Sequence, residues 1–238
     1  MKFLLILLIA ITFFGCSTEE KLGATQIIDN AIKYHGGDNY DTLNVSFQFR
    51  EKAYTIAHKN GLYTYKRIFS DSNKNIVDIL TNEGFTRLIN DSLVKLSSKD
   101  SIAYANSVNS VQYFALLPFG LNNPAVIADL IKTQKIEDKE YYCIQIAFKA
   151  ENGGKDYQDE FMYWIDTVDF SVDYLAYNYE TDGGGVRFRK AYNQREINGI
   201  FFQDYLNFKA PNGSPLKLLP ELYKNDQLTL LSKIELVF

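Results

Sequence analysis

The sequence predicts a mainly β protein of the α+β class, built from antiparallel strands. Aromatic residues make up 15% of the chain, with 17 Tyr and 17 Phe, and aromatic and β-branched side chains favour strands. Long stretches alternate between apolar and polar residues, which is typical of strands with one buried face. Asn-Gly pairs at 60–61 and 198–199 are strong signals for tight hairpins.

The first segment has the features of a secretory signal peptide. Lys2 precedes a run over residues 3–14 that is apolar except for Thr12, and the small residue Gly15 follows, which is the order expected of an exported chain. The run is too short to cross a bilayer, because a spanning helix needs about 20 apolar residues. We therefore predict that residues 1–15 are a signal peptide.

Cys16 follows the small residue directly. The string Phe13-Phe14-Gly15-Cys16 resembles the bacterial lipobox, and that resemblance implies that Cys16 becomes the lipidated N-terminus and holds the protein at a membrane. The alternative is an ordinary cleaved signal peptide in which Cys16 has no special role.

Residues 16–22 are mostly polar and are predicted to form a tether. The pair Glu19-Glu20 resembles the export signal of surface lipoproteins in Bacteroidota-type bacteria. The alternative is a solvated linker. We expect an outer-membrane, lipid-anchored protein, on either the periplasmic face or the cell surface.

The chain then alternates between helices and strands in a definite order. Apolar residues at helical spacing predict a helix over 25–35, which Gly36-Gly37 ends, and a second helix over 98–117. Asn123-Pro124 resembles a helix start and predicts a short helix to about 131. Strands are predicted before the second helix at 43–58, 62–69, 76–81, 85–89 and 92–96, and after it at 134–136, 141–150, 160–166, 172–180, 186–195, 200–209 and 228–237.

Composition excludes several classes of function. The formal net charge is −4 and no basic stripe is present, so we expect no nucleic-acid partner. The two cysteines, Cys16 and Cys143, exclude a disulfide framework if the first is lipidated. His35 and His58 match no metal-ligand spacing. We expect no cofactor, no metal and a monomer.

Several strings resemble families of bacterial envelope proteins. They are Tyr-His-Gly-Gly at 34–37, Tyr-Phe-Ala-Leu-Leu-Pro at 113–118, Asp-Glu-Phe-Met-Tyr-Trp-Ile at 159–165, Asp-Tyr-Leu-Ala-Tyr at 173–177 and Arg-Phe-Arg at 187–189. They resemble an uncharacterised family of Bacteroidota lipoproteins. With the order of elements, they are similar to the lipoprotein carriers LolA and LolB. The resemblance implies one domain over 23–238, a half-barrel in which a single highly curved antiparallel sheet of about 11–12 strands wraps around the helices.

A half-barrel holds a ligand if its inner face is apolar and incompletely filled, and ligand cavities usually exceed about 300 Å³. The aromatic candidates to line such a cavity are Phe47, Phe49, Tyr63, Tyr65, Phe161, Tyr163, Trp164, Tyr177, Phe202 and Tyr205. The alternative is that these side chains fill the core.

A second candidate is a charged constellation. Arg187 and Arg189 share one face of a strand, and Asp159 and Asp173 are plausible partners because unpaired buried charge is unfavourable. These arginines would bind a carboxylate or phosphate head group. The alternative is a solvated face with surface ion pairs.

Three functions follow from these observations. The first is non-covalent binding of an apolar or amphiphilic ligand, such as a lipid or acyl chain, for carriage or sensing. The second is a structural or interaction module with a filled core. The third is a hydrolase, which is disfavoured because adjacent Asp159 and Glu160 would point to opposite faces of a strand. We therefore predict a protein that is not an enzyme.

Overall fold

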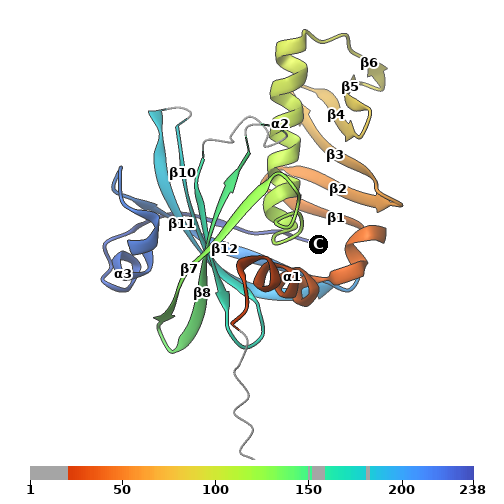
Figure 1. Ribbon diagram of the computed structural model, residues 1–238. Coiled ribbons are helices and arrows are strands. Elements are labelled where there is room, and N and C mark those ends of the chain that lie inside the picture. The colour runs from red at the N-terminus through yellow and green to blue at the C-terminus, as the bar shows by residue number, and fades with distance from the viewer. Residues whose placement is uncertain (1–20, 150, 152–158, 181–182) are drawn as a thin grey trace, which may run out of the picture.

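The computed structural model describes residues 21–149, 151, 159–180 and 183–238. The predicted signal peptide, Cys16 and most of the tether lie outside these residues. The described chain is mainly antiparallel β-structure with helices (Figure 1), so the predicted class is confirmed.

The N-terminal half of the chain forms a six-stranded antiparallel meander in sequence order, here called sheet A. Its strands are β1 (Asn44–Phe49), β2 (Lys52–Lys59), β3 (Leu62–Asp71), β4 (Lys74–Thr81), β5 (Gly84–Ile89) and β6 (Ser92–Leu93). The predicted strand 43–58 is thus two strands. Arg50 has φ 55° and turns the chain between them, and no glycine signals this turn.

The C-terminal half forms a seven-stranded antiparallel meander, here called sheet B. Its strands are β7 (Val126–Ile136), β8 (Lys139–Phe148), β9 (Phe161–Asp166), β10 (Val172–Tyr179), β11 (Gly185–Ile197), β12 (Ile200–Ala210) and β13 (Thr229–Ile234). The described residues therefore form 13 strands in two sheets, where the sequence predicted about twelve in one.

The two sheets meet at the C-terminal end of the chain. The Val237 backbone N–H donates to the Gln48 carbonyl at 2.9 Å, and the Gln48 N–H donates to the Val237 carbonyl at 2.7 Å. The Phe238 ring lies 5.8 Å from the Phe47 ring and 4.8 Å from the Phe202 ring. The segment after β13 thus connects β1 to sheet B. The two sheets together therefore resemble the single curved sheet that the sequence predicted.

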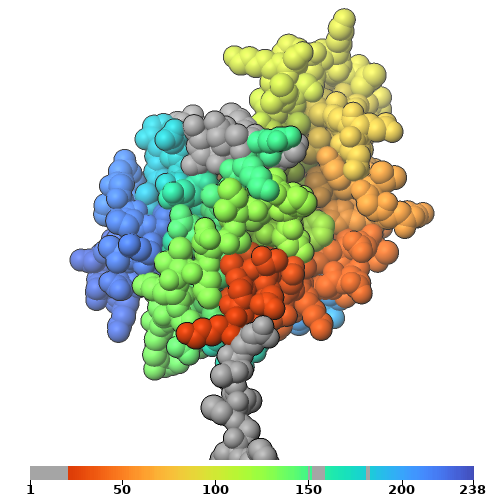
Figure 2. Space-filling model, in the orientation of Figure 1, coloured from red at the N-terminus to blue at the C-terminus, as the bar shows by residue number. Residues whose placement is uncertain are grey.

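Two long helices pack on the same side of this surface. The helices are α1 (Ala24–His35) and α2 (Ser98–Ala115), and both confirm predictions. Ile27, Ile28 and Ala31 of α1 and Val108 and Val111 of α2 belong to one large core with both sheets. Figure 2 shows the red segment of α1 lying against the green segment of β7.

Short helices complete the chain. The 3-10 helix η1 (Gly37–Thr42) follows α1, while η3 (Leu216–Leu218) and α3 (Leu219–Lys224) precede β13. Leu216 and Leu219 pack on the other face of sheet B in a second, smaller core, and Figure 1 shows α3 on the side of sheet B away from α2. No helix was predicted between residues 209 and 228, and Pro220 lies in the first turn of α3.

The predicted helix over 123–131 is wrong. Residues from Val126 onward form β7, which pairs with β8. The register shifts between Leu130 and Lys132, and such a bulge places two successive residues opposite one. The Asn123-Pro124 pair, which resembled a helix start, forms a turn instead: the Ala125 N–H donates to Asn123 Oδ1 at 3.0 Å and the Val126 N–H donates to the Asn123 carbonyl at 2.8 Å.

Candidate functional site

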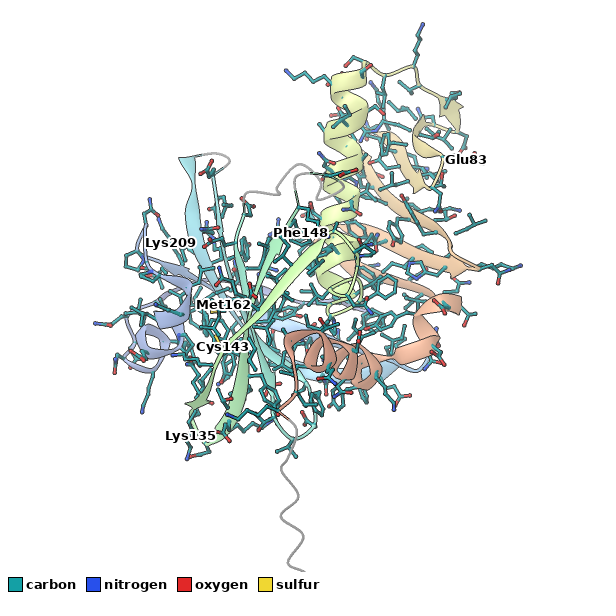
Figure 3. All side chains as sticks on the ribbon, in the orientation of Figure 1. Glu83, Lys135, Cys143, Phe148, Met162 and Lys209 are labelled. Carbon is teal, nitrogen blue, oxygen red and sulfur yellow. The ribbon has the colours of Figure 1, made fainter. Side chains whose placement is uncertain are left out.

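A cavity of about 610 Å³ lies between the second half of α2 and sheet B. The face of sheet B that lines it is here called the concave face. Phe148, at the end of β8 and labelled in Figure 3, lies beside α2. The lining is mostly apolar and aromatic, with Phe49, Val111, Tyr113, Phe114, Leu117, Phe148, Phe161, Tyr163, Leu175, Tyr177 and Ile234, and includes the polar Arg50, Asn106, Asn109, Ser110, Asp159, Arg189 and Asn207.

Strand register explains how sheet B contributes to the cavity. Tyr163 of β9 pairs with Leu175 of β10, Leu175 pairs with Arg189 of β11, and Arg189 pairs with Asn207 of β12. Directly paired residues of antiparallel strands share one face. The row therefore crosses four neighbouring strands and places one arginine at the centre of the concave face.

Aromatic rings form the walls beside this row. The Phe161 ring lies 5.7 Å from both the Phe148 ring and the Tyr177 ring. On the opposite wall the Phe49 ring meets the Phe114 ring of α2 edge-on at 5.2 Å. Such surfaces bind apolar chains by removing their area from water.

Arg189 is a charged group on the sheet side of the cavity. Its Nη2 donates to the Tyr177 hydroxyl at 3.0 Å, and its guanidinium carbon lies 5.2 Å from the Tyr177 ring centre and 5.7 Å from the Phe114 ring centre. Its Nε is buried without a hydrogen-bond partner. Arg189 is absent from the ion pairs formed within the described chain.

Burial controls the ionisation of the tyrosines near this cavity. It raises the pKa of Tyr113 to about 12 and holds the pKa of Tyr163 well above its ordinary value. Both phenols are therefore neutral at physiological pH. Positive charge from Arg189 is not neutralised by a phenolate on either ring.

A second cavity, of about 540 Å³, adjoins the first. Both are lined by Asn109, Tyr113 and Phe148, and the second cavity also contacts Tyr63 and Tyr65 of sheet A. Gln112 of α2 lines the second cavity and is only 1% exposed. Neither its Nε2 nor its Oε1 has a hydrogen-bond partner.

The predicted lining residues fall into distinct groups. Phe49, Phe161, Tyr163, Tyr177 and Arg189 line the first cavity, and Tyr63 and Tyr65 line the second. Phe47, Phe202 and Tyr205 lie in the large core instead. Tyr205 accepts a hydrogen bond from Gln203 Nε2 at 2.8 Å, and its burial raises its pKa to about 12.

Trp164 does not line the cavity. Adjacent residues of a strand point to opposite faces, so Trp164 lies behind its neighbour Tyr163. Its ring meets Phe188 edge-on at 5.8 Å in the smaller core under α3. The same core contains Cys143, whose Sγ lies 3.1 Å from Met162 Sδ (Figure 3); burial raises the pKa of Cys143 to about 11.

The predicted partners of the two arginines are also corrected. Arg187 donates to the Tyr179 hydroxyl and to the Val186 carbonyl and does not line the cavity. Asp173 accepts from Lys139 at 3.2 Å and from Tyr141 at 2.9 Å, because β10 turns it away from the concave face. Asp159 lines the cavity together with Arg189.

The most buried charged cluster was not predicted. Asp78 of β4, which is fully buried, accepts from Arg67 of β3 at 2.6 Å and from Arg87 of β5 at 2.6 Å. Arg67 also donates to Ser107 Oγ at 2.6 Å, and the Arg87 guanidinium lies 3.5 Å from the Tyr104 ring centre. The cluster therefore attaches α2 to sheet A. The register of the two hairpins pairs Asp78 with both Arg67 and Arg87, and that register could have revealed the cluster.

Two kinds of feature are absent from the described part of the chain. Residues 21–149, 151, 159–180 and 183–238 contain no group of three or more His, Cys, Asp or Glu that could hold a metal ion. Within the same ranges, none of the helices combines the length and apolarity needed to cross a membrane.

A curved antiparallel sheet with helices across its concave face defines a LolA-like fold. The crystal structure of a LolA superfamily protein from Nitrosomonas europaea matches 81% of this chain and 88% of its own, with a TM-score of 0.50 and 10% identity. A DUF1329 family protein from Desulfovibrio piger matches 76% of this chain and 85% of its own, with a TM-score of 0.35 and 11% identity.

The chain belongs to a family of unknown function, DUF6503, whose model matches residues 2–236. No curated protein matches the sequence.

Proposed function

We propose that this protein binds an amphiphile non-covalently in the cavity between α2 and the concave face of sheet B, for carriage or sensing at the cell envelope. The observation that carries the proposal is an aromatic-walled space of about 610 Å³, which is within the usual range for ligand pockets. The LolA-like fold supports it as well.

The alternative, an interaction module with a filled core, fits less well. A filled core would leave no second space, yet a cavity of about 540 Å³ adjoins the first one. Well-packed interiors contain few voids larger than a water molecule. A hydrolase is not supported either, because Asp159 lines this cavity whereas Glu160 lines a different pocket.

We also propose that acyl chains on Cys16 hold the protein at the outer membrane. The lipobox-like string before Cys16 supports this anchor. A single acyl chain binds membranes only marginally, whereas two or more give stable attachment. In this proposal the anchor fixes the location, the cavity takes the ligand, and the protein acts as a monomer.

The binding proposal is tested by filling the space from α2. Asn109 is exposed and lines both cavities, so Asn109→Trp should place an indole where they join. We expect binding of tetradecanoate, measured by calorimetry, to weaken by at least about tenfold, because apolar contact area is lost.

Ala103→Trp is the matched control. Ala103 is exposed on the same helix and does not line either cavity, so this variant should bind like the wild type. Equal affinities for the wild type and Asn109→Trp would place the binding elsewhere. Absence of bound lipid in native mass spectrometry, together with no binding of tetradecanoate, would overturn the proposal.

A further inference from the structure

We propose that Arg189 binds the anionic head group, a carboxylate or a phosphate, of the amphiphile in this cavity. The inference rests on the proposed function and adds the chemical class of the ligand. Its starting point is the position of Arg189 on a central strand of sheet B, facing the cavity among Leu175, Tyr177 and Phe114.

The hydrogen bonds of Arg189 leave much of its donor capacity unused. A guanidinium has five N–H donors and no acceptor. Within the described chain, Arg189 donates to the neutral Tyr177 hydroxyl, and its buried Nε has no partner. A buried donor that is left unpaired is unfavourable, and more so when it is charged.

The other arginines of the described chain show what is missing. Arg67 and Arg87 share Asp78, and Arg195 pairs with Asp204 at 3.0 Å. Arg187 donates to two oxygens but lies outside the cavity. Arg50 lines the cavity beside Phe49, but it is exposed to solvent. Arg189 therefore combines access to the cavity with a half-buried guanidinium that no side-chain carboxylate pairs with in the ion pairs of the described residues.

A second polar group completes the site beside Arg189. Asn207, its cross-strand neighbour, donates from Nδ2 to Ser232 Oγ at 3.2 Å, and its buried Oδ1 has no partner. The Ser232 hydroxyl both donates and accepts, so the amide can turn and present its N–H₂ to the cavity. Arg189 and Asn207 then offer adjacent donors to the oxygens of one anion.

The walls indicate where the rest of the ligand lies. Phe148, Phe161 and Phe114 line the same cavity as Arg189, and Phe148 also lines the second cavity. An alkyl chain whose head group contacts Arg189 therefore has aromatic walls beside it under α2. Charge at one end and apolar walls beyond it fit an anionic amphiphile.

The test compares three probes that share one alkyl chain, namely tetradecanoate, tetradecyl phosphate and tetradecanol, below their micelle concentrations. Calorimetry should show that the wild type binds both anions about 10- to 100-fold more tightly than the alcohol, as expected for charge-assisted hydrogen bonds. Arg189→Met should bind the anions no better than the alcohol. Arg189→Gln should lose the preference equally and guards against a folding defect in the first variant.

Arg187→Met is the matched control, because Arg187 lies two residues away on the same face and is bonded to Tyr179. It should keep the wild-type preference. Tighter binding of one anion than the other would identify the head group as carboxylate or phosphate. A preference that survives in Arg189→Met, or a wild type that binds all three probes equally, would refute the role of Arg189 while leaving the binding function intact. Failure of all three probes to bind would instead contradict the proposed function.

Discussion

His35 shows how a single buried side chain makes the fold sensitive to acid. It is fully buried at the end of α1, and its Nε2 accepts a hydrogen bond from the Val172 N–H at 3.1 Å. Burial lowers its pKa to about 4, from an ordinary value of 6.5, despite the nearby charges of Asp173 and Asp169. A charged imidazole at the end of a helix would complement the helix dipole, whereas the buried imidazole of His35 is neutral at physiological pH.

The free energy of unfolding should therefore fall as the pH drops from about 6.5 to about 4. The unfolded chain binds a proton in this window that the folded chain excludes, and the loss is on the order of 3 kcal/mol at the acid end. Urea denaturation at several pH values measures it. His35→Gln should have a shallower pH dependence over the same window, and identical slopes for the two proteins would contradict this explanation.

The buried amide of Gln112 should lower the stability of the folded protein. Both atoms of its buried amide lack partners, so Gln112→Leu should raise the free energy of unfolding of the ligand-free protein by about 1–3 kcal/mol. Gln203→Leu is the control, because the Gln203 amide donates to the Val172 carbonyl and the Tyr205 hydroxyl. This control should be destabilised, and a destabilised Gln112→Leu would show that the Gln112 amide is satisfied.

At the scale of elements, α2 depends on the ion cluster beneath it. Asp78→Asn should lower the free energy of unfolding by about 3–5 kcal/mol, because it leaves the guanidinium groups of Arg67 and Arg87 buried without their carboxylate. Denaturation by urea tests this. Asp71→Asn, at the exposed end of β3, should change stability little. A similarly small effect in Asp78→Asn would mean that packing alone holds α2.

Elements with a regular local pattern were predictable from the sequence, and irregular ones were not. The alternation from Val45 to Phe49 gives β1 directly, and the glycines after α1 mark its end. The Arg50 turn breaks the two-residue period without a glycine, and the Asn123-Pro124 pair before β7 forms a turn rather than a helix start, so local patterns misplaced both. Tyr163 and Trp164 are adjacent on β9 and cannot both face the cavity, so the prediction that both line it was wrong for Trp164.

At the scale of the whole molecule, the candidate site depends on contacts between distant parts of the chain. Arg189 and Phe114 lie far apart in sequence and meet only because α2 crosses the open side of sheet B. Sequence reasoning named Arg189 and several aromatic neighbours, but the unpaired Nε of Arg189 and the two adjoining cavities under α2 are properties of packing. Neither property has a local signature that a single sequence could reveal.

Attachment to the membrane is the prediction that concerns the whole protein. Cys16→Ala should move the protein from the membrane fraction to the soluble fraction in cell fractionation, because acyl chains are the proposed anchor. Ser17→Ala, which changes the next residue, should leave it with the membrane. Membrane association that persists in Cys16→Ala would refute lipidation as the anchor.

The position of Trp164 has a practical consequence for spectroscopy. It is the only tryptophan in the chain, and it lies on the reverse side of sheet B, in contact with Phe188. Its fluorescence emission should report unfolding of the smaller core under α3 and should not change when a ligand binds beneath α2. An optical assay of occupancy therefore needs an added fluorophore or an indole introduced on the opposite side of the sheet.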